Sequence, residues 1–482
     1  MPCHGGEIQN ILLIKSLKNG NPKKHLMKKS ILITAVCLCS QLVFSQNADS
    51  VMIKKIVDET MTNGTSYENL RKLCKQVGPR LSGSPQFAKA VKLVAGMMKQ
   101  IGADAVYLQQ CMVPHWVRGE KEKGQIILAD GKKYDLKLCA LGNSVGTGTK
   151  GVTANVVEVN SIEQLDELGT NGVKGKIVFF NFPMNQTYIK TFRAYGESGA
   201  SRNKGPMLAG KYGAVGAIVR SLAINLNDYP HTGATGYNDS FPKIPAVAIS
   251  TNDAEYLSKQ IKNRNVSKAY FRTTSTMLPD AVGYNVIGEI KGSQFPEEII
   301  TVGGHLDSWD LAEGANDDGS GVVQSMEVLR TLKALGIKPK RTIRAVAFAN
   351  EENGGRGGQK YLDEAKAKNE KHIFALESDA GGFTPRGFSL DMTDAQRNKI
   401  MQWKDLFYPY GASDIIAGGS GSDVGHLKEI GTALAGFTPD SQRYFDIHHA
   451  ATDVFENVSE RELKLGAANM TALIWLISEY GL

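Results

Sequence analysis

The chain has 482 residues, of which 42% are apolar and 22% are charged. This composition is typical of a globular protein of two or three domains, and it excludes a disordered chain, a collagen-like chain and a bundle of membrane helices. The formal net charge of +7 lies mostly in the first 45 residues, which contribute +5, because the remainder holds 50 basic and 48 acidic residues. That balance predicts no nucleic-acid partner and no binding to an acidic membrane surface.

The first 45 residues have the layout of a secretory signal peptide that starts at Met27. Two lysines follow this methionine, residues 31–44 are largely apolar, and the stretch ends in a small residue at Ser45. We expect cleavage after Ser45, a mature chain that starts at Gln46, and a secreted or periplasmic protein without a stable membrane anchor. The alternative, a membrane anchor, is disfavoured because Ser40 interrupts a stretch that is shorter than the ~20 residues of a span.

Three of the six cysteines lie in this leader, and the mature chain keeps Cys74, Cys111 and Cys139. The leader cysteines at 37 and 39 do not follow small residues, which argues against lipidation. Three is an odd number, so at most one disulfide bond can form within the mature chain. No two cysteines are separated by two residues, so the sequence gives no support to a thiolate zinc site or a redox pair.

Apolar residues at helical spacing fill the first part of the mature chain. Leu70, Leu73 and Val77 begin a pattern with intervals of three or four residues. We therefore predict helices from about 50 to 118, within a first segment of the main domain at 46–118.

Residues 119–282 consist of short apolar runs broken by Gly and Pro, which is typical of a β-rich domain. Three runs, in the order 174–178, 211–219 and 244–250, resemble strands of the protease-associated domain that is inserted in many exopeptidases. The resemblance implies an inserted domain without catalytic residues, and an unrelated β-rich domain is the alternative.

Strands and helices alternate in residues 283–482, the second segment of the main domain. Strands are predicted at 299–302, 344–349 and 373–376, with helices at 322–332 and 359–366 and a last helix capped by Ser459. Such alternation predicts an α/β fold with a mostly parallel central sheet and helices on both faces.

The residues that follow the predicted strands are rich in metal-binding side chains. They are His305, Asp307, Asp317, Asp318, Glu351, Glu352 and Asp379, with His448 and His449 near the end of the chain. Sites in open parallel sheets lie beyond the carboxyl ends of the strands, so we expect these side chains to meet. Imidazole and carboxylate groups suit Zn²⁺, and two ions ~3.5–4 Å apart need five or six such ligands with one carboxylate shared. No His-Glu-x-x-His sequence occurs, which excludes the common single-zinc protease helix.

Together with residues 119–282, these loops resemble the co-catalytic di-zinc exopeptidases, a family that includes secreted bacterial aminopeptidases, glutamate carboxypeptidases and carboxypeptidase Q. The likeness covers nearly the whole mature chain, and the order of parts is most similar to the carboxypeptidase Q type. It implies two zinc ions per chain: His305 and Asp379 would bind one, Glu352 and His449 the other, and Asp317 would bridge them. It also implies a cis peptide bond after Asp317.

The resemblance implies further roles around these ligands. Glu351 would be the general base, and Asp307 would accept the second ring N–H of His305 and fix its tautomer. His449 is preferred over His448 as the ligand because the family histidine is followed four residues later by an acid, here Asp453. His448 then stands where many relatives have a tyrosine that donates to the oxyanion, and it is either such a donor or a residue of the pocket wall.

The glycine-rich run 418–423 resembles the substrate loop of the family. This likeness implies that Asp423 binds the substrate, for example its α-amine. The alternative is a surface loop in which Asp423 caps a helix.

We therefore expect a secreted zinc exopeptidase that hydrolyses short peptides or dipeptides with a metal-activated water, as an aminopeptidase or a carboxypeptidase. One alternative is a glutaminyl cyclase-like transferase, although those enzymes lack a segment like residues 119–282. The other is a non-catalytic receptor-like homologue, which the complete ligand set disfavours. A homodimer is expected from family likeness alone.

Overall fold

The computed structural model describes residues 48–482, so the predicted signal peptide and its cleavage site lie outside the described residues. Residues 55–482 form one compact unit, and in the other unit, residues 1–54, the described part 48–54 is helical. No helix within residues 48–482 is both long enough and apolar enough to cross a membrane.

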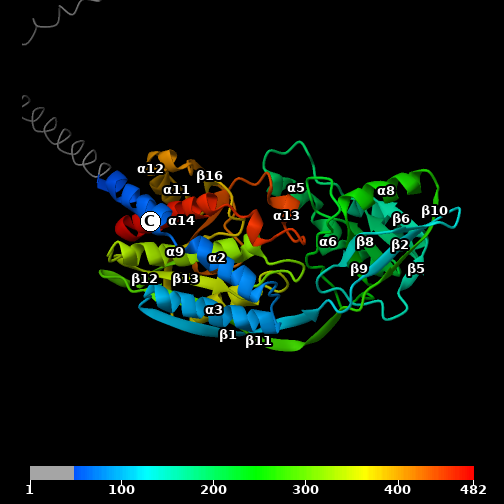
Figure 1. Cartoon of the computed structure of the whole chain (residues 1–482), viewed down its shortest axis with the longest axis horizontal. Coiled ribbons are helices and arrows are strands. Elements are labelled where there is room, and N and C mark those ends of the chain that lie inside the picture. Colours follow the sequence, from blue (N-terminus) through cyan, green and yellow to red (C-terminus); the bar gives the residue numbers. More distant parts are fainter. Residues whose placement is uncertain (1–47) are drawn as a thin grey trace, which may run out of the picture. The chain divides into compact units, whose positions relative to one another are not determined.

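The larger unit is built on an eight-stranded sheet with the order β1-β11-β13-β12-β14-β17-β15-β16 (Figure 1). Its strands are β1 (Ala105–Val117), β11 (Thr276–Ile290), β12 (Phe295–His305), β13 (Arg341–Phe348), β14 (Lys371–Glu377), β15 (Pro385–Asp391), β16 (Asp414–Ala417) and β17 (Ala433–Pro439). The four central neighbours β13, β12, β14 and β17 run parallel, and so do β15 and β16 at one edge. The pairs β1 with β11, β11 with β13, and β15 with β17 are antiparallel. The predicted mostly parallel sheet is confirmed.

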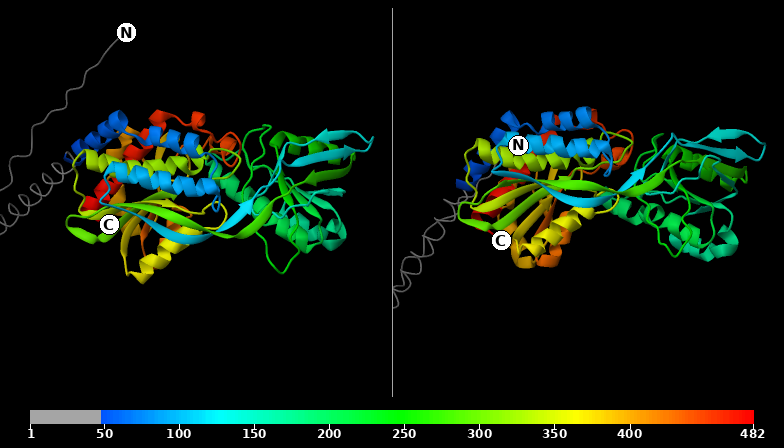
Figure 2. Two further views of the ribbon diagram at one scale, coloured as in Figure 1. Left: turned by 60° about the horizontal axis from the view of Figure 1, so that its bottom comes forward. Right: turned by 90° about the horizontal axis from the view of Figure 1, so that it is seen from below.

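Helices cover both faces of this sheet (Figure 2), as predicted. On one face α9 (Ser320–Ala334) packs against α14 (Glu460–Tyr480), together with α2 (Ser66–Lys72) and α3 (Pro85–Ile101). On the other face α10 (Arg356–Ala367) packs against β1, β11 and the 3₁₀ segment η4 (Val424–Ile430). The shorter elements are η1 (Leu73–Val77), η2 (Ala315–Gly319), α11 (Asp394–Met401), α12 (Lys404–Phe407), η3 (Tyr408–Tyr410), α13 (Tyr444–Ile447) and η5 (Phe455–Asn457).

The predicted helix boundaries are wrong at the end of the first segment, because residues 105–117 form strand β1. Helix α3 ends at Ile101, and Gly102 continues in the left-handed region with a φ of 82°. Beyond it the burial alternates, with Cys111 and Val113 buried and Met112 exposed. This period of two is the signature of a strand with one covered face, and it differs from the helical spacing before Gly102.

Residues 123–272 form two sheets of their own. The first contains β3 (Lys133–Asp135), β2 (Lys123–Leu128), β10 (Val266–Arg272) and β5 (Val152–Ala154), and the second contains β4 (Leu138–Ala140), β9 (Ala246–Ile249), β8 (Gly216–Arg220), β7 (Ile177–Phe180) and β6 (Val156–Val159). The helices are α4 (Ile162–Val173), α5 (Thr191–Ser198), α6 (Ala200–Asn203), α7 (Gly205–Lys211) and α8 (Thr251–Lys262). The chain enters this segment from β1 and leaves it into β11, and its protease-associated identity and its limits at 119 and 282 stay predictions.

Cys74, Cys111 and Cys139 are buried free thiols, so none of them forms a disulfide bond. Burial raises the pKa of the Cys74 thiol to about 12 and that of Cys111 to about 11. These thiols are therefore protonated and inert near neutral pH.

Candidate metal centre

The sheet brings the predicted ligands together at the carboxyl ends of its central strands. His305 is the last residue of β12, the pair Glu351 and Glu352 follows β13, and Asp379 follows β14. Asp317 lies in the turn η2 before α9, and His449 lies in the loop after α13. Parallel strands end at one edge of the sheet, which is why residues far apart in the sequence meet here.

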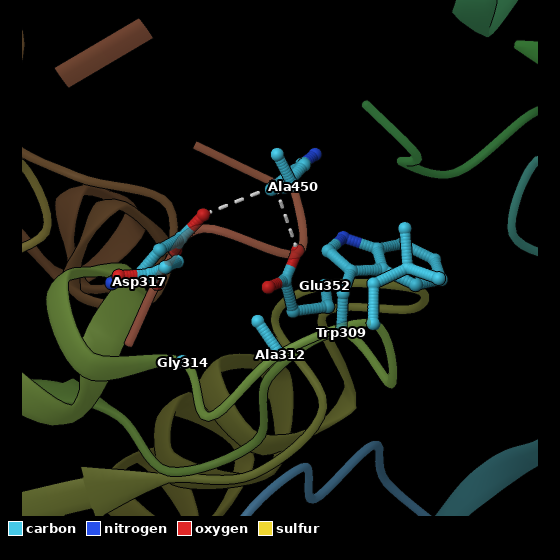
Figure 3. Close-up of a pocket in the computed structure, with 9 residues that line it drawn as sticks. Trp309, Ala312, Gly314, Asp317, Glu352 and Ala450 are labelled. Atoms are coloured by element: carbon cyan, nitrogen blue, oxygen red, sulfur yellow. Dashed lines mark hydrogen bonds and ion pairs between the residues drawn. The ribbon is translucent and has the colours of Figure 1, made fainter. Parts of the chain in front are cut away.

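Asp317 lies between two groups of ligands. Its Oδ1 is 3.2 Å from Nε2 of His305, which in turn is 3.5 Å from Oδ1 of Asp379. Its Oδ2 is 3.1 Å from Nε2 of His449, which in turn is 3.1 Å from Oε2 of Glu352. The two oxygens of one carboxylate thus face two different imidazoles, and Figure 3 shows Asp317 and Glu352 pointing toward the same space beside Trp309.

The tautomer of His305 leaves its Nε2 free to bind a metal. Nδ1 of His305 lies 2.9 Å from the backbone carbonyl of Asp307, and Nδ1 of His449 lies 3.3 Å from the backbone carbonyl of Thr232. A carbonyl oxygen only accepts, so Nδ1 of His305 carries the proton and donates it, and the Nε2 lone pair of His305 is then aimed at carboxylate oxygens, which also have lone pairs. Nδ1 of His449 also lies 3.3 Å from the donor Nη1 of Arg202, so the tautomer of His449 depends on which of its two neighbours it pairs with.

This arrangement of acceptors facing acceptors fits a bound cation. Ligand atoms around a tetrahedral zinc ion at ~2.0–2.2 Å lie roughly 3.3–3.5 Å apart, close to the separations found here. Nε2 of His305, Oδ2 of Asp317 and Oε1 of Glu352 are also buried without a hydrogen-bond partner among the described residues. Such orphaned atoms are rare in proteins unless a ligand or ion completes them.

The pKa values of the ligands respond to the same crowding. Burial raises the pKa of Glu352 to about 8, with Asp317 acting in the same direction, and burial raises the pKa of Asp379 to about 6. Burial lowers the pKa of His305, but the nearby carboxylates of Asp317 and Asp379 raise it well above the ordinary value. The raised pKa values mean that these side chains bind protons more readily than usual, because the cluster carries an excess of negative charge. Such an excess favours the binding of a cation.

Asp318 lies near His305 and Asp379 as well, and its carboxylate could also reach a cation placed between them. Its Oδ2, however, accepts the backbone N–H of His305 at 3.0 Å, and its Oδ1 accepts that of Gly321 at 2.9 Å. We therefore assign Asp318 to holding the loop. The peptide bond between Asp317 and Asp318 is cis, as the resemblance implies.

The position of Asp317 between the two groups of side chains is held by Asp453, whose role the sequence showed only as a spacing. The carboxylate of Asp453 accepts the backbone N–H of Asn316 at 2.8 Å and that of Asp317 at 3.1 Å. The buried guanidinium of Arg80 donates to the carbonyls of Leu306 and Gly314 on either side of this loop. Nothing in the sequence around Arg80 pointed to this function.

The predicted contact between His305 and the carboxylate of Asp307 needs correction. The carboxylate oxygen is 3.9 Å from Nδ1 of His305, whereas the backbone carbonyl of the same residue is 2.9 Å away. The Asp307 carboxylate instead accepts the backbone N–H of Glu351 at 3.1 Å. Asp307 thus fixes the tautomer of His305 through its backbone and positions Glu351 through its side chain.

The two adjacent glutamates differ in exposure. The side chain of Glu352 is 3% exposed and faces His449, whereas that of Glu351 is 20% exposed and lines an open pocket. Asn350 has a left-handed φ of 66° directly before them, which turns the chain at the end of β13. One glutamate is therefore placed to bind metal, and its neighbour is free to meet a water molecule.

His448 stacks on His449 with ring centroids 3.6 Å apart. Its Nε2 lies 3.5 Å from Oδ2 of Asp317, and its Nδ1 is buried without a hydrogen-bond partner. The ring lines the same pocket as Glu351. This geometry suits both roles predicted for His448, the oxyanion donor and the pocket wall.

Asp423 is buried and does not line the pocket over the centre, whereas its neighbour Ser422 does. The backbone N–H of Asp423 donates to Oε1 of Glu377 at 3.3 Å, and its side chain makes no capping hydrogen bond to η4. The side chain of Asp423 therefore cannot contact a substrate in this pocket, and the predicted substrate-binding role is wrong for this structure. The glycine-rich loop itself contributes Gly419 and Ser420 to a second cavity next to Asp379.

A pocket of about 630 Å³ lies over the centre. Its lining combines Asp317, Glu351, Glu352, Asp379 and both histidines with residues from the β-rich segment 123–272, including Tyr195 and Arg202. This volume suits a small molecule or a short peptide.

Comparisons with known proteins agree with this geometry. The family model described as peptidase family M28 matches residues 285–474. Carboxypeptidase Q from Mus musculus is 34% identical over 415 residues, which cover 86% of this chain and 85% of that protein. The crystal structure of a peptidase M28 precursor from Shewanella amazonensis superposes with a TM-score of 0.85 at 30% identity, covering 90% of this chain and 97% of the other.

A zinc aminopeptidase from Bacillus subtilis shares the fold, with a TM-score of 0.60 at 22% identity over 86% of this chain and 95% of that one. Two findings assign the sequence to a family: the carboxypeptidase Q match covers most of both chains, and the family model covers the loops that carry the predicted ligands. The chain belongs to peptidase family M28.

Proposed function

We propose that this protein is a zinc metallopeptidase that removes single residues from short peptides or dipeptides. One observation carries the proposal: the two oxygens of Asp317 face two separate ligand groups, His305 with Asp379 and His449 with Glu352. Two zinc ions sharing one carboxylate fit such a constellation. Family membership supports the metallopeptidase class, and the names of relatives include both carboxypeptidase Q and a zinc aminopeptidase.

The chemistry that bound zinc supplies is polarisation of the scissile carbonyl and acidification of a water molecule to a pKa of ~7. The residues of the chain do the rest. Glu351 takes the proton from the attacking water and passes it to the nitrogen of the leaving amine. Asp307 holds the backbone of Glu351, and His448 is placed to donate a hydrogen bond to the oxygen that gains charge.

We further propose that the protein is exported by the signal peptide, acts without nucleic-acid or membrane partners, and forms a homodimer. The layout of residues 27–45 supports export, and the charge balance beyond residue 45 supports the absence of nucleic-acid and membrane partners. The homodimer rests on family likeness.

The test starts from purified protein beginning at Gln46 and stripped of metal with a chelator. Zinc is returned in steps of half an equivalent while the release of free amino acids from a panel of dipeptides and tripeptides is followed. We expect activity to reach its plateau at two equivalents per chain. A plateau at one equivalent would reject the two-metal centre, and zinc binding without hydrolysis of any peptide would reject the substrate class. Release of pyroglutamate from peptides with N-terminal glutamine would favour the cyclase alternative, and failure to bind zinc would favour the receptor-like one.

A further inference from the structure

Arg202, on helix α6 of the β-rich segment, is a buried cation in the wall of the pocket. The residue is 6% exposed, and no carboxylate among the described residues lies within ion-pair distance of its guanidinium. Its partners are neutral: it donates to the hydroxyl of Tyr195, to the carbonyl of Thr232 at 3.3 Å and to the side-chain oxygen of Asn203 at 3.4 Å. Buried charges in proteins are normally paired, because the loss of hydration is costly. An unpaired guanidinium in a pocket wall therefore points to an anionic ligand.

A glycine leaves the space that this guanidinium occupies. Gly233 lies against its plane, and a Cβ atom at this position would come within 2.4 Å of Cζ of Arg202. Gly233 also has a φ of 132°, which side-chain-bearing residues rarely adopt. The exposed Lys204 lines the same pocket and adds a second positive charge. Two basic residues thus line the pocket together with the carboxylates of the metal centre.

The distance from Arg202 to the centre suits one particular anion. Its Nη1 lies 3.3 Å from Nδ1 of His449, so the width of one imidazole ring separates the guanidinium from the metal-facing Nε2. In a peptide, three bonds separate the scissile carbonyl carbon from the carboxylate carbon of the next residue, a span of about 3–4 Å. The carboxylate of an acidic side chain is separated from the scissile carbon by more bonds than the α-carboxylate, so it would extend past the guanidinium.

We propose that Arg202 binds the free α-carboxylate of the residue that leaves, which makes the protein an enzyme for dipeptides and peptide C-termini. This inference rests on the proposed function and names the end of the substrate that is read. The carboxylate would replace the missing counter-ion, with the planar guanidinium offering two parallel N–H donors. The segment 123–272 would then determine specificity while the sheet carries out the chemistry.

The experiment compares three substrates with the zinc-loaded enzyme: alanylalanine, alanylalanine amide and the α-amide of alanylglutamic acid. For the wild type we expect kcat/KM for alanylalanine to exceed that for either amide by about 10–100-fold, the value of one or two charge-assisted hydrogen bonds. Arg202→Met should lower kcat/KM for alanylalanine by a similar factor and change the amides less than about 3-fold. Arg202→Lys keeps the positive charge but loses the planar pair of N–H donors, so its kcat/KM for alanylalanine should lie between those of the wild type and Arg202→Met.

Arg193→Met is the matched control. It removes an arginine of the neighbouring helix α5 that pairs with Glu197 at the surface, and it should leave all three rates unchanged. Gly233→Ala should also lower kcat/KM for alanylalanine, because the added Cβ must displace the guanidinium of Arg202. Zinc content and the thermal melting curve of each variant show that the fold and the metal centre are intact.

Three outcomes would overturn the inference. Equal wild-type rates for alanylalanine and its amide would show that the carboxylate is not read. Faster cleavage of the glutamyl amide than of the alanyl amide, lost in Arg202→Met, would show that an acidic side chain is the ligand. An equal loss for all substrates in Arg202→Met, or a loss of zinc, would show that Arg202 only positions Thr232 and His449. If the wild type cleaves no peptide, the proposed function fails first.

Discussion

The two ends of the central sheet hold charged groups in opposite ways. At the carboxyl ends, Glu352 and Asp379 lie buried in a cluster that holds several carboxylates and only histidines as partners, and burial raises their pKa values to about 8 and about 6. At the amino ends of the same strands, Glu298 lies 2.6 Å from Arg341 and 2.7 Å from Lys371, and these partners lower its pKa. Glutamates in one sheet thus differ in ionisation because of what faces them. Carboxylates crowded together without Lys or Arg mark the functional end, and carboxylates paired with Lys or Arg mark the end that only supports the fold.

The comparison predicts that substitutions at the carboxyl ends remove metal and activity, whereas substitutions at the amino ends remove only stability. The largest effect is expected at Asp317, because its two oxygens serve both ligand groups. Asp317→Asn keeps the shape but loses the bridging charge, so zinc content should fall below one equivalent and kcat/KM should fall by more than about 10⁴-fold. Metal analysis after gel filtration and dipeptide hydrolysis measure the two quantities.

Asp239→Asn is the matched control, since the side chain of Asp239 is 94% exposed. It should retain both zinc ions and full activity. If Asp317→Asn still bound two zinc ions with unchanged affinity, the bridging assignment would be wrong.

The next effect separates two neighbours at the end of β13. Glu351→Gln should keep both zinc ions and lower kcat by about 10²–10⁴-fold, the usual contribution of a general base, with little change in KM. Glu352→Gln should instead lower zinc content, because its side chain faces His449. The pair tests the assignment within one loop, and loss of zinc from Glu351→Gln would contradict the role of Glu351 as an unligated base.

A smaller effect is expected one step away from the ligands, at Asp453. Asp453→Asn replaces a carboxylate, whose two oxygens each accept one backbone N–H group, with an amide that must turn its NH₂ donor toward one of those N–H groups. Asp317 then loses part of its support, and zinc affinity, measured by competition with a chelator, should fall about 10–100-fold. At saturating zinc most of kcat should return. An unchanged affinity would show that the loop holds Asp317 without Asp453.

The same comparison explains what the sequence could predict. Ligands such as His305 and Asp379 directly follow apolar strands, so their meeting at one edge follows from the parallel topology. The residues that hold them left weaker signals: Arg80 comes from the helical first segment, and Thr232 from the β-rich segment, more than 200 residues before His449 in the chain. Contacts of this kind depend on tertiary packing, which no local pattern records. The role of Asp423 was misread for a related reason, because a glycine-rich loop does not show which of its side chains turns inward.

The smallest effect concerns Glu370 at the amino end of β14, and it tests the other half of the comparison. Glu370 lies 2.9 Å from Arg344 and 3.0 Å from His372. Burial raises its pKa, but the hydrogen bonds with His372 and Arg344 outweigh burial and lower the pKa to about 2. A folded pKa below the unfolded value means that the ionised carboxylate stabilises the fold above about pH 4.5 and that this stability is lost as the pH falls toward 2.

Glu370→Gln should therefore lower the free energy of unfolding at pH 7 by about 1–2 kcal/mol, less than the full pKa shift implies because the side chain is 18% exposed. Urea unfolding at pH 7 and at pH 3.5 measures the difference from the wild type, which should shrink at the lower pH because Glu370 protonates in the unfolded chain below about pH 4.5 while it stays ionised in the folded protein. Zinc content and kcat at pH 7 should stay the same, because the substitution lies at the opposite end of the strand from Asp379. A loss of zinc or activity without a loss of stability would show that the two ends are coupled, and the division between a functional and a supporting end of the sheet would have to be abandoned.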